Sequence, residues 1–581
     1  MREQRIRVNG SRVFARIVEV AFLALCPALA LWVMHFSPIA QKEFADPYVY
    51  TGYINNFEDL FQRYGVTYYG VRFGLVAPAQ LAAAVFGPVG GYVVLRYAYC
   101  LIAGLPFYLL VRQRFGRPAA VASISLLLTS PYFARTILWD HPDAAGVPFL
   151  FAAICLFLIE GRRRLALDAS AAICAGMALH SNVFVAAPLA IIVGTWTLLS
   201  VLWRRDVRAI ASRLTVVLSG IGGISALAAG YYRWRVDVAD IFSITFNKSL
   251  ELASGGMVEW RTPGIEWVTR EWHVLTPVAL ALLALAAWSK HRSGFEETVM
   301  WLTAAATTAF FYVMQFGLGG NSLELFYYFS YLLPSVFLLV ALIVGALLNG
   351  AGPRSSSAAV ALLVSAAIGP WILYSLGRGI AYPTRIGHYL AAVGAGAAAL
   401  LLWRWVPRFR PATAVCAAAA FGFMLFSSFA RPVYARMIDS RVQAVRSDVD
   451  VYRVALQLIE IVPRWSANPG AVGFWYSNEA SPIQSIQSTY LFGFSRVQGE
   501  GRGLPHLEAA DLQRLGRMQL KWLVLLAETE GELASGLETL SRIGIEHEPV
   551  DRRVLRSGTY AVHFELLELR PHTEDRSPPP P

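Results

Sequence analysis

A series of long apolar runs, separated by short basic segments, is the feature that most constrains this chain. A helix needs about 20 apolar residues to cross a bilayer, and the runs before residue 430 are too many and too long for a soluble core. Only 15% of the residues are charged, against about 25% in ordinary soluble domains. We therefore predict about 13 transmembrane helices, at 16–36, 90–111, 118–132, 144–160, 166–180, 183–203, 214–232, 274–289, 297–317, 325–347, 358–377, 389–406 and 412–430.

The formal charge of +11 is placed in a way that argues against nucleic acid as a partner. Residues 1–430 hold 33 Lys and Arg against 20 Asp and Glu, whereas residues 431–581 hold 17 against 19. The excess therefore lies in the hydrophobic part, in short clusters between apolar runs rather than along one basic face. This distribution is typical of the positive-inside rule for membrane proteins.

The basic clusters also predict the topology. They fall in alternate connections, so a cytoplasmic N-terminus places all of them inside, and an odd number of helices exports the C-terminus. The basic N-terminus precedes an apolar run without a clear cleavage site, which indicates a retained first helix. We predict a multi-pass protein of the inner (plasma) membrane whose clusters include 112–117, 162–164, 204–213 and 404–410, with Lys290, Arg292 and Arg354.

The composition becomes that of a soluble domain after residue 433. Apolar runs of β type alternate there with predicted helices, which favours a small extracytoplasmic α/β domain at 434–570. The proline-rich end, 571–581, predicts a disordered tail. The strands are expected at 471–476, 521–527 and 559–569, and the helices at 439–461, 483–492 and 529–542.

The fold class is thus mainly α, a polytopic bundle over 1–433 followed by the α/β domain. Its longest outer connection, 37–89, contains the apolar stretch 68–91, which prolines and glycines interrupt. We expect helices on the membrane surface there rather than a clean crossing. The five cysteines lie in apolar runs without CxxC spacing and are interpreted as small core residues: Cys26, Cys100, Cys155, Cys174 and Cys416.

Acidic residues beside a membrane are costly and are therefore functional candidates. Asp46 lies in EFADPYVYTGY, just after the first apolar run, and ARTILWDHPDAAG places Asp140, His141 and Asp143 before the fourth predicted helix. Asp46 is followed by Pro47, which is also how an ordinary helix begins. Asp143 could likewise cap a helix. Both acids are therefore candidates for helix capping as well as for catalysis.

The order of these features resembles the C-type integral-membrane glycosyltransferases (GT-C fold), in the branch of the protein O-mannosyltransferases and the aminoarabinose transferase of lipid A. The resemblance is carried by Asp46 with its tyrosines in the first outer loop, the Tyr/Arg segment after it and Pro142-Asp143-Ala144. It implies an essential acid at Asp46, acting as the catalytic base, and a sugar donor on a polyprenyl phosphate or diphosphate. Asp46-Pro47 stands where many relatives carry Asp-Glu.

Transfer of a sugar from a lipid phosphate needs a base for the acceptor hydroxyl and cations for the leaving phosphate. We predict Asp46 and Asp143 as catalytic residues. Arg72 and Arg96 are the best placed cations, although Arg72 could instead be an arginine that snorkels to the interface. The expected substrate-binding residues are Arg72, Arg96, Arg135, Tyr48, Tyr50, Tyr69 and His141.

No cofactor is indicated with certainty. A divalent metal ion is left open, with Asp46, Asp140 and Asp143 as its weak candidates and His180 as a nitrogen donor. Two aromatic segments, 249–273 and 324–334, could contact substrate, or they could belong to the interfacial aromatic belt.

The hypothesis is an inverting glycosyltransferase that acts in the bilayer, on the extracytoplasmic side, with a polyprenyl-phosphate sugar donor and an envelope glycan, lipid or protein as acceptor. One alternative is a transporter or flippase of lipid-linked saccharides, although no internal repeat is found. The other is a GT-C-like scaffold without catalysis.

Overall fold

The computed structural model divides the chain into two units, one of residues 1–36, 71–82 and 90–439, the other of residues 37–70, 83–89 and 440–581. The domain boundaries at 433 and 570 stay predictions. The described residues are 17, 19–31, 46–138, 141–161, 163–205, 207–238, 240–253, 274–288, 294–320, 322–323, 326–349, 355–365, 394, 398, 415–419, 421–422, 454, 457–458, 461, 472–476, 521–542, 544–558 and 560–570.

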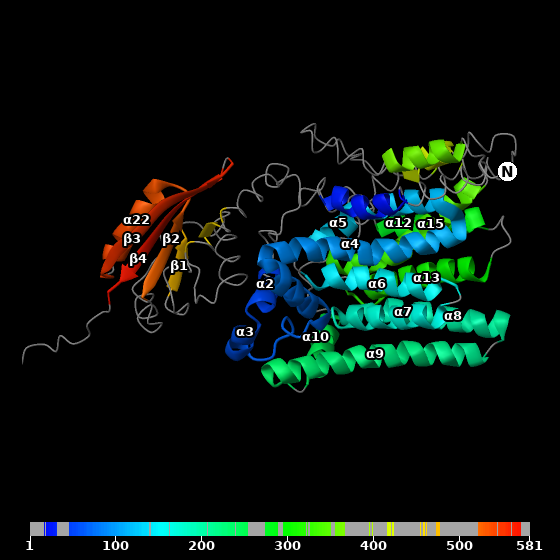
Figure 1. Cartoon of the computed structure of the whole chain (residues 1–581), viewed down its shortest axis with the longest axis horizontal. Helices are drawn as coiled ribbons and strands as arrows, with labels where there is room; N and C mark the ends of the chain where they lie inside the picture. Colours follow the sequence, from blue (N-terminus) through cyan, green and yellow to red (C-terminus); the bar gives the residue numbers. More distant parts are fainter. Residues whose placement is uncertain are drawn as a thin grey trace, which may run out of the picture. The chain divides into compact units, whose positions relative to one another are not determined.

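The first unit is a bundle of apolar helices that run side by side (Figure 1). Five segments of the described chain are long and apolar enough to cross a membrane: 90–128, 183–204, 207–236, 295–317 and 330–348. The prediction of a polytopic helical bundle is confirmed, although its count of 13 crossings is not. The main helices are α4 (Phe73–Leu128), α6 (Pro142–Leu158), α7 (Arg164–Leu179), α8 (Ala186–Leu199), α9 (Val207–Val236), α12 (Leu275–Trp288), α13 (Phe295–Tyr312) and α15 (Leu333–Asn349).

Helix α4 contains a reversal, as the sequence predicted by separating 90–111 from 118–132. Gly116 has φ +86°, a left-handed conformation that glycine adopts without strain, and Pro118 follows it. A Cβ on Gly104 would lie 3.3 Å from Ile124 and 3.7 Å from Leu128. Residues 20 apart along a straight helix would be about 30 Å apart. The two halves of α4 therefore pack against each other as a hairpin around Gly116.

Helices α7 and α9 are parallel neighbours, joined at three levels. Asp168 accepts hydrogen bonds from Arg213 at 2.9 to 3.2 Å, and His180 Nε2 lies 2.9 Å from Ser225 Oγ. Between these levels the helices approach closely, since a Cβ on Gly220 would lie 2.4 Å from the Cβ of Ala172. Small residues at a crossing allow such close backbone approach in membranes.

One end of the bundle gathers the predicted inner connections. Arg114 lies 3.5 Å from Glu160 and 3.2 Å from Glu296, and Arg204 lies 2.8 Å from Glu160 and also pairs with Glu296. Near them Glu19 pairs with two further arginines of α4. The basic segments around 112–117, 160–164 and 204–213 therefore lie at a common end, as the predicted alternation requires.

The predicted outer loop is largely helical. It contains α2 (Asp46–Asn55), α3 (Phe57–Tyr64) and the first part of α4, which is interrupted at Gly87 with φ +75°. Leu81, Val85 and Phe86 are exposed on this first part. Exposed apolar side chains agree with the expected surface helices. Two further helices were missed by the sequence analysis, α5 (Pro131–Leu138) and α10 (Phe242–Ala253).

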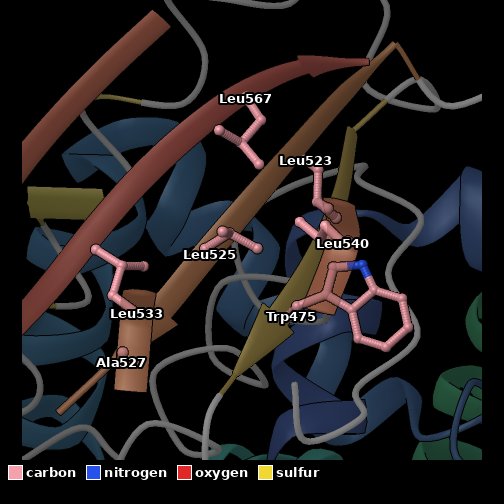
Figure 2. Close-up of a cluster of buried hydrophobic side chains, with 7 residues drawn as sticks. All are labelled: Trp475, Leu523, Leu525, Ala527, Leu533, Leu540 and Leu567. Atoms are coloured by element: carbon pink, nitrogen blue, oxygen red, sulfur yellow. The ribbon is translucent and has the colours of Figure 1, made fainter. Parts of the chain in front are cut away.

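The C-terminal part forms a four-stranded mixed sheet in the order β1-β2-β4-β3, with helix α22 (Glu530–Arg542). Strands β1 and β2 are parallel and the other pairs antiparallel. Leucines of β2 and β4 pack with Trp475 of β1 and with Leu533 and Leu540 of α22 in one apolar cluster (Figure 2). The strands are β1 (Val472–Tyr476), β2 (Trp522–Ala527), β3 (His547–Ser557) and β4 (Tyr560–Leu569).

This sheet agrees with the predicted runs of β type, with one strand added. β3 was missed because HEPVDRRVLRS is almost entirely polar. Its neighbour β4 is apolar and lies between β2 and β3, so β3 is the edge strand of the sheet. The predicted helix 439–461 is described at a few positions, and Gln457 there donates to the carbonyl oxygen of Arg556 on β3 at 2.9 Å. The tail 571–581, the predicted helix 483–492 and most of the last two predicted crossings lie outside the described residues.

Candidate functional site

Asp46 is the first residue of α2, with Pro47 directly after it in the first turn. Proline is favoured in a helical first turn, where its missing N–H is not needed. The helix start predicted for Asp46-Pro47 is therefore confirmed. A helix N-terminus also leaves a carboxylate in a favourable electrostatic position, so this placement is compatible with a chemical role. The side chains of Asp46 and Tyr48 lie outside the described part of the structure.

Aromatic packing holds α2 against the segment that follows α3. The rings of Tyr50 and Tyr69 meet edge to face with centroids 5.4 Å apart, and Tyr53 Oη lies 2.7 Å from Thr67 Oγ1. Tyr50 and Tyr53 are each 1% exposed. Gly70 permits this packing, because a Cβ there would lie 2.8 Å from the ring of Phe61. The segment after Asp46 is thus a folded unit.

Arg72 is completely buried in the first unit, just before α4 begins. Its carbonyl oxygen accepts hydrogen bonds from Leu75 and Val76 in the first turn of the helix. Two residues on, the backbone N–H of Gly74 donates to the carbonyl oxygen of His180 at 3.2 Å. An arginine that snorkels keeps its guanidinium in water, so the interfacial alternative for Arg72 is wrong.

Arg96 is also completely buried, on the second part of α4. Its guanidinium carbon lies 4.2 Å from the ring centroid of Tyr92 and 5.8 Å from that of Tyr99. Tyr92 donates a hydrogen bond to the carbonyl oxygen of Leu138, and Tyr99 packs edge to face on Phe149 of α6. The aromatic faces stabilise a cation away from water.

His141 and Asp143 meet at the start of α6. His141 is the N-cap residue, and its Nδ1 is within hydrogen-bond distance of the Asp143 carboxylate. Asp143 is 0% exposed and His141 5% exposed. Because the cap position is occupied by His141, the alternative of Asp143 as a simple N-cap is wrong. Its position in the first turn still places the carboxylate near the positive end of the helix.

The aromatic segment near 324–334 packs inside the bundle. Tyr331 is 0% exposed, and its hydroxyl approaches α6 at Gly146, where a Cβ would lie 2.7 Å from that oxygen. The ring of Tyr328 packs on Phe184 with centroids 5.1 Å apart, and Phe329 packs on Tyr132 at 4.9 Å. These side chains therefore do not form an interfacial belt, and one of them reaches the helix turn after Asp143.

Several predicted site residues are not placed beside those described above. Asp140 and the segment 254–273 lie outside the described residues, and Arg135 is placed on α5 by its backbone only. His180 packs on Phe73 and Phe242 rather than beside Asp143. Within the part of the chain that the structure describes, no group of three or more His, Cys, Asp and Glu could hold a metal ion.

The aromatic partners of Arg96 and the contact of Tyr331 with Gly146 were not predicted. Tyr92 and Tyr99 stand four residues before and three after Arg96, a spacing that places them on the same helix face. This signal was available in YVVLRYAY. Tyr331 is about 190 residues from Gly146, so no local pattern could pair them.

The comparison with solved structures finds matches over nearly the whole chain. ArnT from Cupriavidus metallidurans in the apo state matches with a TM-score of 0.50 and 12% identity, over 95% of this chain and 98% of that one. The same protein bound to undecaprenyl phosphate matches with a TM-score of 0.46 and 12% identity, over 94% of this chain and 97% of that one. A third match is the archaeal oligosaccharyltransferase AglB from Archaeoglobus fulgidus, in complex with an inhibitory peptide and a dolichol-phosphate. Its TM-score is 0.44 and its identity 13%, over 97% of this chain and 75% of that one.

No family model and no curated protein matches the sequence. At 12% identity the likeness to apo ArnT concerns the fold, and it extends over both chains almost completely. It agrees with the helical bundle, the helices of the predicted first outer loop and the C-terminal sheet described above. The chain is a multi-pass membrane protein with the fold of the C-type integral-membrane glycosyltransferases, the GT-C fold.

Proposed function

We propose that this chain is a membrane glycosyltransferase that moves a sugar from a polyprenyl-phosphate donor to an envelope acceptor on the extracytoplasmic side of the inner membrane. The observation that carries the proposal is the match to ArnT over 95% of this chain and 98% of that one. A match of this extent includes the first outer loop as well as the transmembrane helices. Fold alone does not determine function. The proposal therefore also depends on Arg72, Arg96 and Asp143 in the bundle and on Asp46 in α2.

The donor class is proposed by analogy with the ligand of that relative. ArnT is known bound to undecaprenyl phosphate. A sugar on such a lipid presents its anomeric carbon near the membrane boundary, with a phosphate as the leaving group. The acceptor would be a hydroxyl of an envelope glycan, lipid or protein.

Asp46 is proposed as the general base. Its carboxylate takes the proton of the acceptor hydroxyl while that oxygen forms a bond to the anomeric carbon and the bond from that carbon to the phosphate oxygen breaks. The leaving group carries both electrons of the broken bond as a lipid phosphate. Direct attack opposite the phosphate inverts the anomeric centre, through a transition state of oxocarbenium character.

Arg72 and Arg96 are proposed to stabilise the leaving phosphate. Both are buried and an arginine side chain stays protonated under all ordinary conditions. Cations fixed in advance, away from water, stabilise developing negative charge more strongly than mobile ions do. Tyr92 and Tyr99 hold the guanidinium of Arg96 in place, and Asp143 with His141 would complete the polar groups of this unit. Tyr48, Tyr50, Tyr69 and Arg135 remain proposed substrate contacts.

The test is sugar transfer by the purified full chain in lipid nanodiscs, supplied with a panel of radiolabelled undecaprenyl-phosphate sugars. We expect the parent to consume one donor and Asp46→Asn to lose at least about a hundredfold in rate, since general-base catalysis contributes roughly 10²- to 10⁴-fold. The matched control is Glu58→Gln, a neighbouring carboxylate on α3 with no proposed role; it should retain the parental rate.

Each alternative function predicts a different result in this test. Equal rates for the parent and Asp46→Asn would remove Asp46 as the base. A protein that consumes no donor but moves labelled lipid-linked saccharide across vesicle membranes would be a flippase. A protein that does neither would be a scaffold, and the glycosyltransferase proposal would be wrong.

A further inference from the structure

The basic end of the bundle contains arginines of two kinds. Most of those described there have an acidic partner within 4 Å. These pairs join α4, α7, α9, α13 and the turn 200–204 that follows α8, and they have a structural role. The paired arginines are Arg112, Arg114, Arg117, Arg164, Arg204 and Arg213.

Arg163, Arg205 and Arg208 differ, because none forms an ion pair with any residue that the structure describes, and all three are exposed. Arg163 is the residue before α7, Arg205 ends the π-helical turn η2 (Ser200–Arg204) with φ +50°, and Arg208 lies in the first turn of α9. Residues 162–163 and 205–208 together contain four arginines against one acid, Asp206, so the local charge is positive whatever Asp206 contacts.

The segments that carry these three arginines meet at one end of the bundle, because Arg204 pairs with Glu160 at 2.8 Å and Arg213 donates to the carbonyl oxygen of Phe157. Helices α7 and α9 run in parallel, and the hydrogen-bonded pair of Asp168 and Arg213 is separated by 45 residues along the chain. The same offset puts Arg163 and Arg208 at one level, at the beginning of the two helices. Like charges gathered at one end of the bundle repel one another, and a bound anion lowers that repulsion.

Exposed apolar side chains flank these arginines along the chain. Leu165 and Val207 are each 68% exposed, Leu202 58% and Trp203 53%. In a chain that crosses a membrane such side chains face acyl chains, and tryptophan prefers the depth of the headgroups. The patch therefore lies where a lipid phosphate would be, with its acyl chains beside the leucines. The positive ends of α7 and α9 add to the attraction.

We infer that Arg163, Arg205 and Arg208 form a binding surface for the headgroup of an anionic phospholipid in the leaflet where α7 and α9 begin. The occupant is a lipid rather than a free phosphate ion, because the charged patch and the exposed apolar side chains belong to one surface. The function of this surface is separate from the proposed sugar transfer. It would fix the start of α9, a helix held in the bundle mainly by α7.

Native mass spectrometry of the full chain with added phosphatidylglycerol or phosphatidylcholine tests the inference. We expect phosphatidylglycerol to bind the parent with higher affinity, and the triple variant R163Q/R205Q/R208Q to lose more than about tenfold, since each basic residue near an anionic surface contributes about fivefold. The matched control is Arg233→Gln, an exposed arginine at the other end of α9; it should bind like the parent.

Two results would overturn the inference. One is unchanged phosphatidylglycerol binding by the triple variant. The other is displacement of the lipid by inorganic phosphate at equal concentration, which would indicate a plain anion site. If the triple variant does not fold, Arg208→Gln alone should still weaken binding by about fivefold, and equal binding would count against the surface.

Discussion

At the scale of single residues, two glycines determine how the proposed site is held. Gly74 lies against the end of α7, where a Cβ would be 2.1 Å from the carbonyl oxygen of Met177 and 2.3 Å from Ser181 Oγ. Gly146 in the same way admits the hydroxyl of Tyr331 to α6. The position of buried Arg72, two residues before Gly74, therefore depends on the absence of a methyl group.

We expect Gly74→Ala to lower the free energy of unfolding by about 1 to 3 kcal/mol, because the added methyl group must push a backbone carbonyl away. It should also slow sugar transfer, since Arg72 moves with the first turn of α4. Thermal unfolding in detergent and the nanodisc transfer assay measure the two effects. Gly230→Ala is the control, because nothing lies within 4 Å of its Cβ position; an unfolding temperature for Gly74→Ala equal to the parent's would contradict the packing argument.

The carboxylate of Glu565 on β4 gives a pH-dependent prediction. Burial raises the pKa of this carboxyl above its usual value of 4.5, and Arg552 opposes the shift only in part. A group whose folded pKa is raised contributes stability that is present below its unfolded pKa and is lost as pH rises through the folded pKa. Ionisation of Glu565 should therefore make the sheet less stable at pH 7 than at pH 4.5.

Glu565→Gln should remove that part of the pH dependence and strengthen the sheet at pH 7. Hydrogen exchange of the β4 amides in the full chain, corrected for the intrinsic rate at each pH, measures this. Glu568→Gln, on the same strand but 40% exposed in its side chain, is the control. Lower protection in Glu565→Gln than in the parent at pH 7 would show that the ion pair with Arg552 outweighs the cost of burial.

At the scale of helices, the contact between α7 and α9 is the clearest case of a buried charge that serves the fold. Asp168 accepts hydrogen bonds from Arg164 of its own helix and from Arg213 of α9. The Arg213 guanidinium also lies 3.9 Å from the ring centroids of both Phe157 and Trp196, and it donates to the carbonyl oxygen of Phe157. One side chain thus joins four helices.

Asp168→Asn should destabilise the protein by about 3 to 5 kcal/mol, because it leaves Arg213 buried without its counter-charge. Arg233→Gln, which breaks an exposed pair on the same helix, should cost less than about 1 kcal/mol. Thermal unfolding of both variants in one detergent gives the comparison. Similar losses for the two would mean that the buried pair contributes no more than a surface pair does.

The helices themselves were predictable because each is a continuous apolar run bounded by polar or basic residues. The predictions 144–160, 166–180 and 274–289 correspond to α6, α7 and α12 within about two residues. Short helices such as α5 were missed because eight residues contain too few turns for a periodic signal. β3 was missed because its stability comes from pairing with β4 rather than from its own residues.

The candidate site was predictable only in part. The spacing in VVLRYAYC and DHPDAAG is local, so Arg96 among tyrosines and His141 beside Asp143 could be expected from sequence. The meeting of Gly74 with His180, or of Gly146 with Tyr331, depends on which helices become neighbours. Apolar runs of similar length do not specify their neighbours, and one sequence offers no other guide.

At the scale of the whole molecule, the predicted orientation follows from where the arginines are. The described connections that are predicted to be inner meet at one end of the bundle. Reporter fusions after residue 164 and residue 435 test which side that end occupies. We expect a cytoplasmic reporter to be active at the first position and an exported reporter at the second. Activity of both fusions on the same side would contradict the odd number of crossings.

The parallel pairing of α7 and α9 has a consequence for biosynthesis. Asp168 leaves the ribosome 45 residues before Arg213, with α8 made in between. A carboxylate that entered the membrane during this interval without a partner would be costly. Arg164, one turn earlier on α7, is already present to neutralise it. The nascent α7 can therefore insert as an electrically balanced segment and later dock α9, so the order of translation and the order of assembly agree.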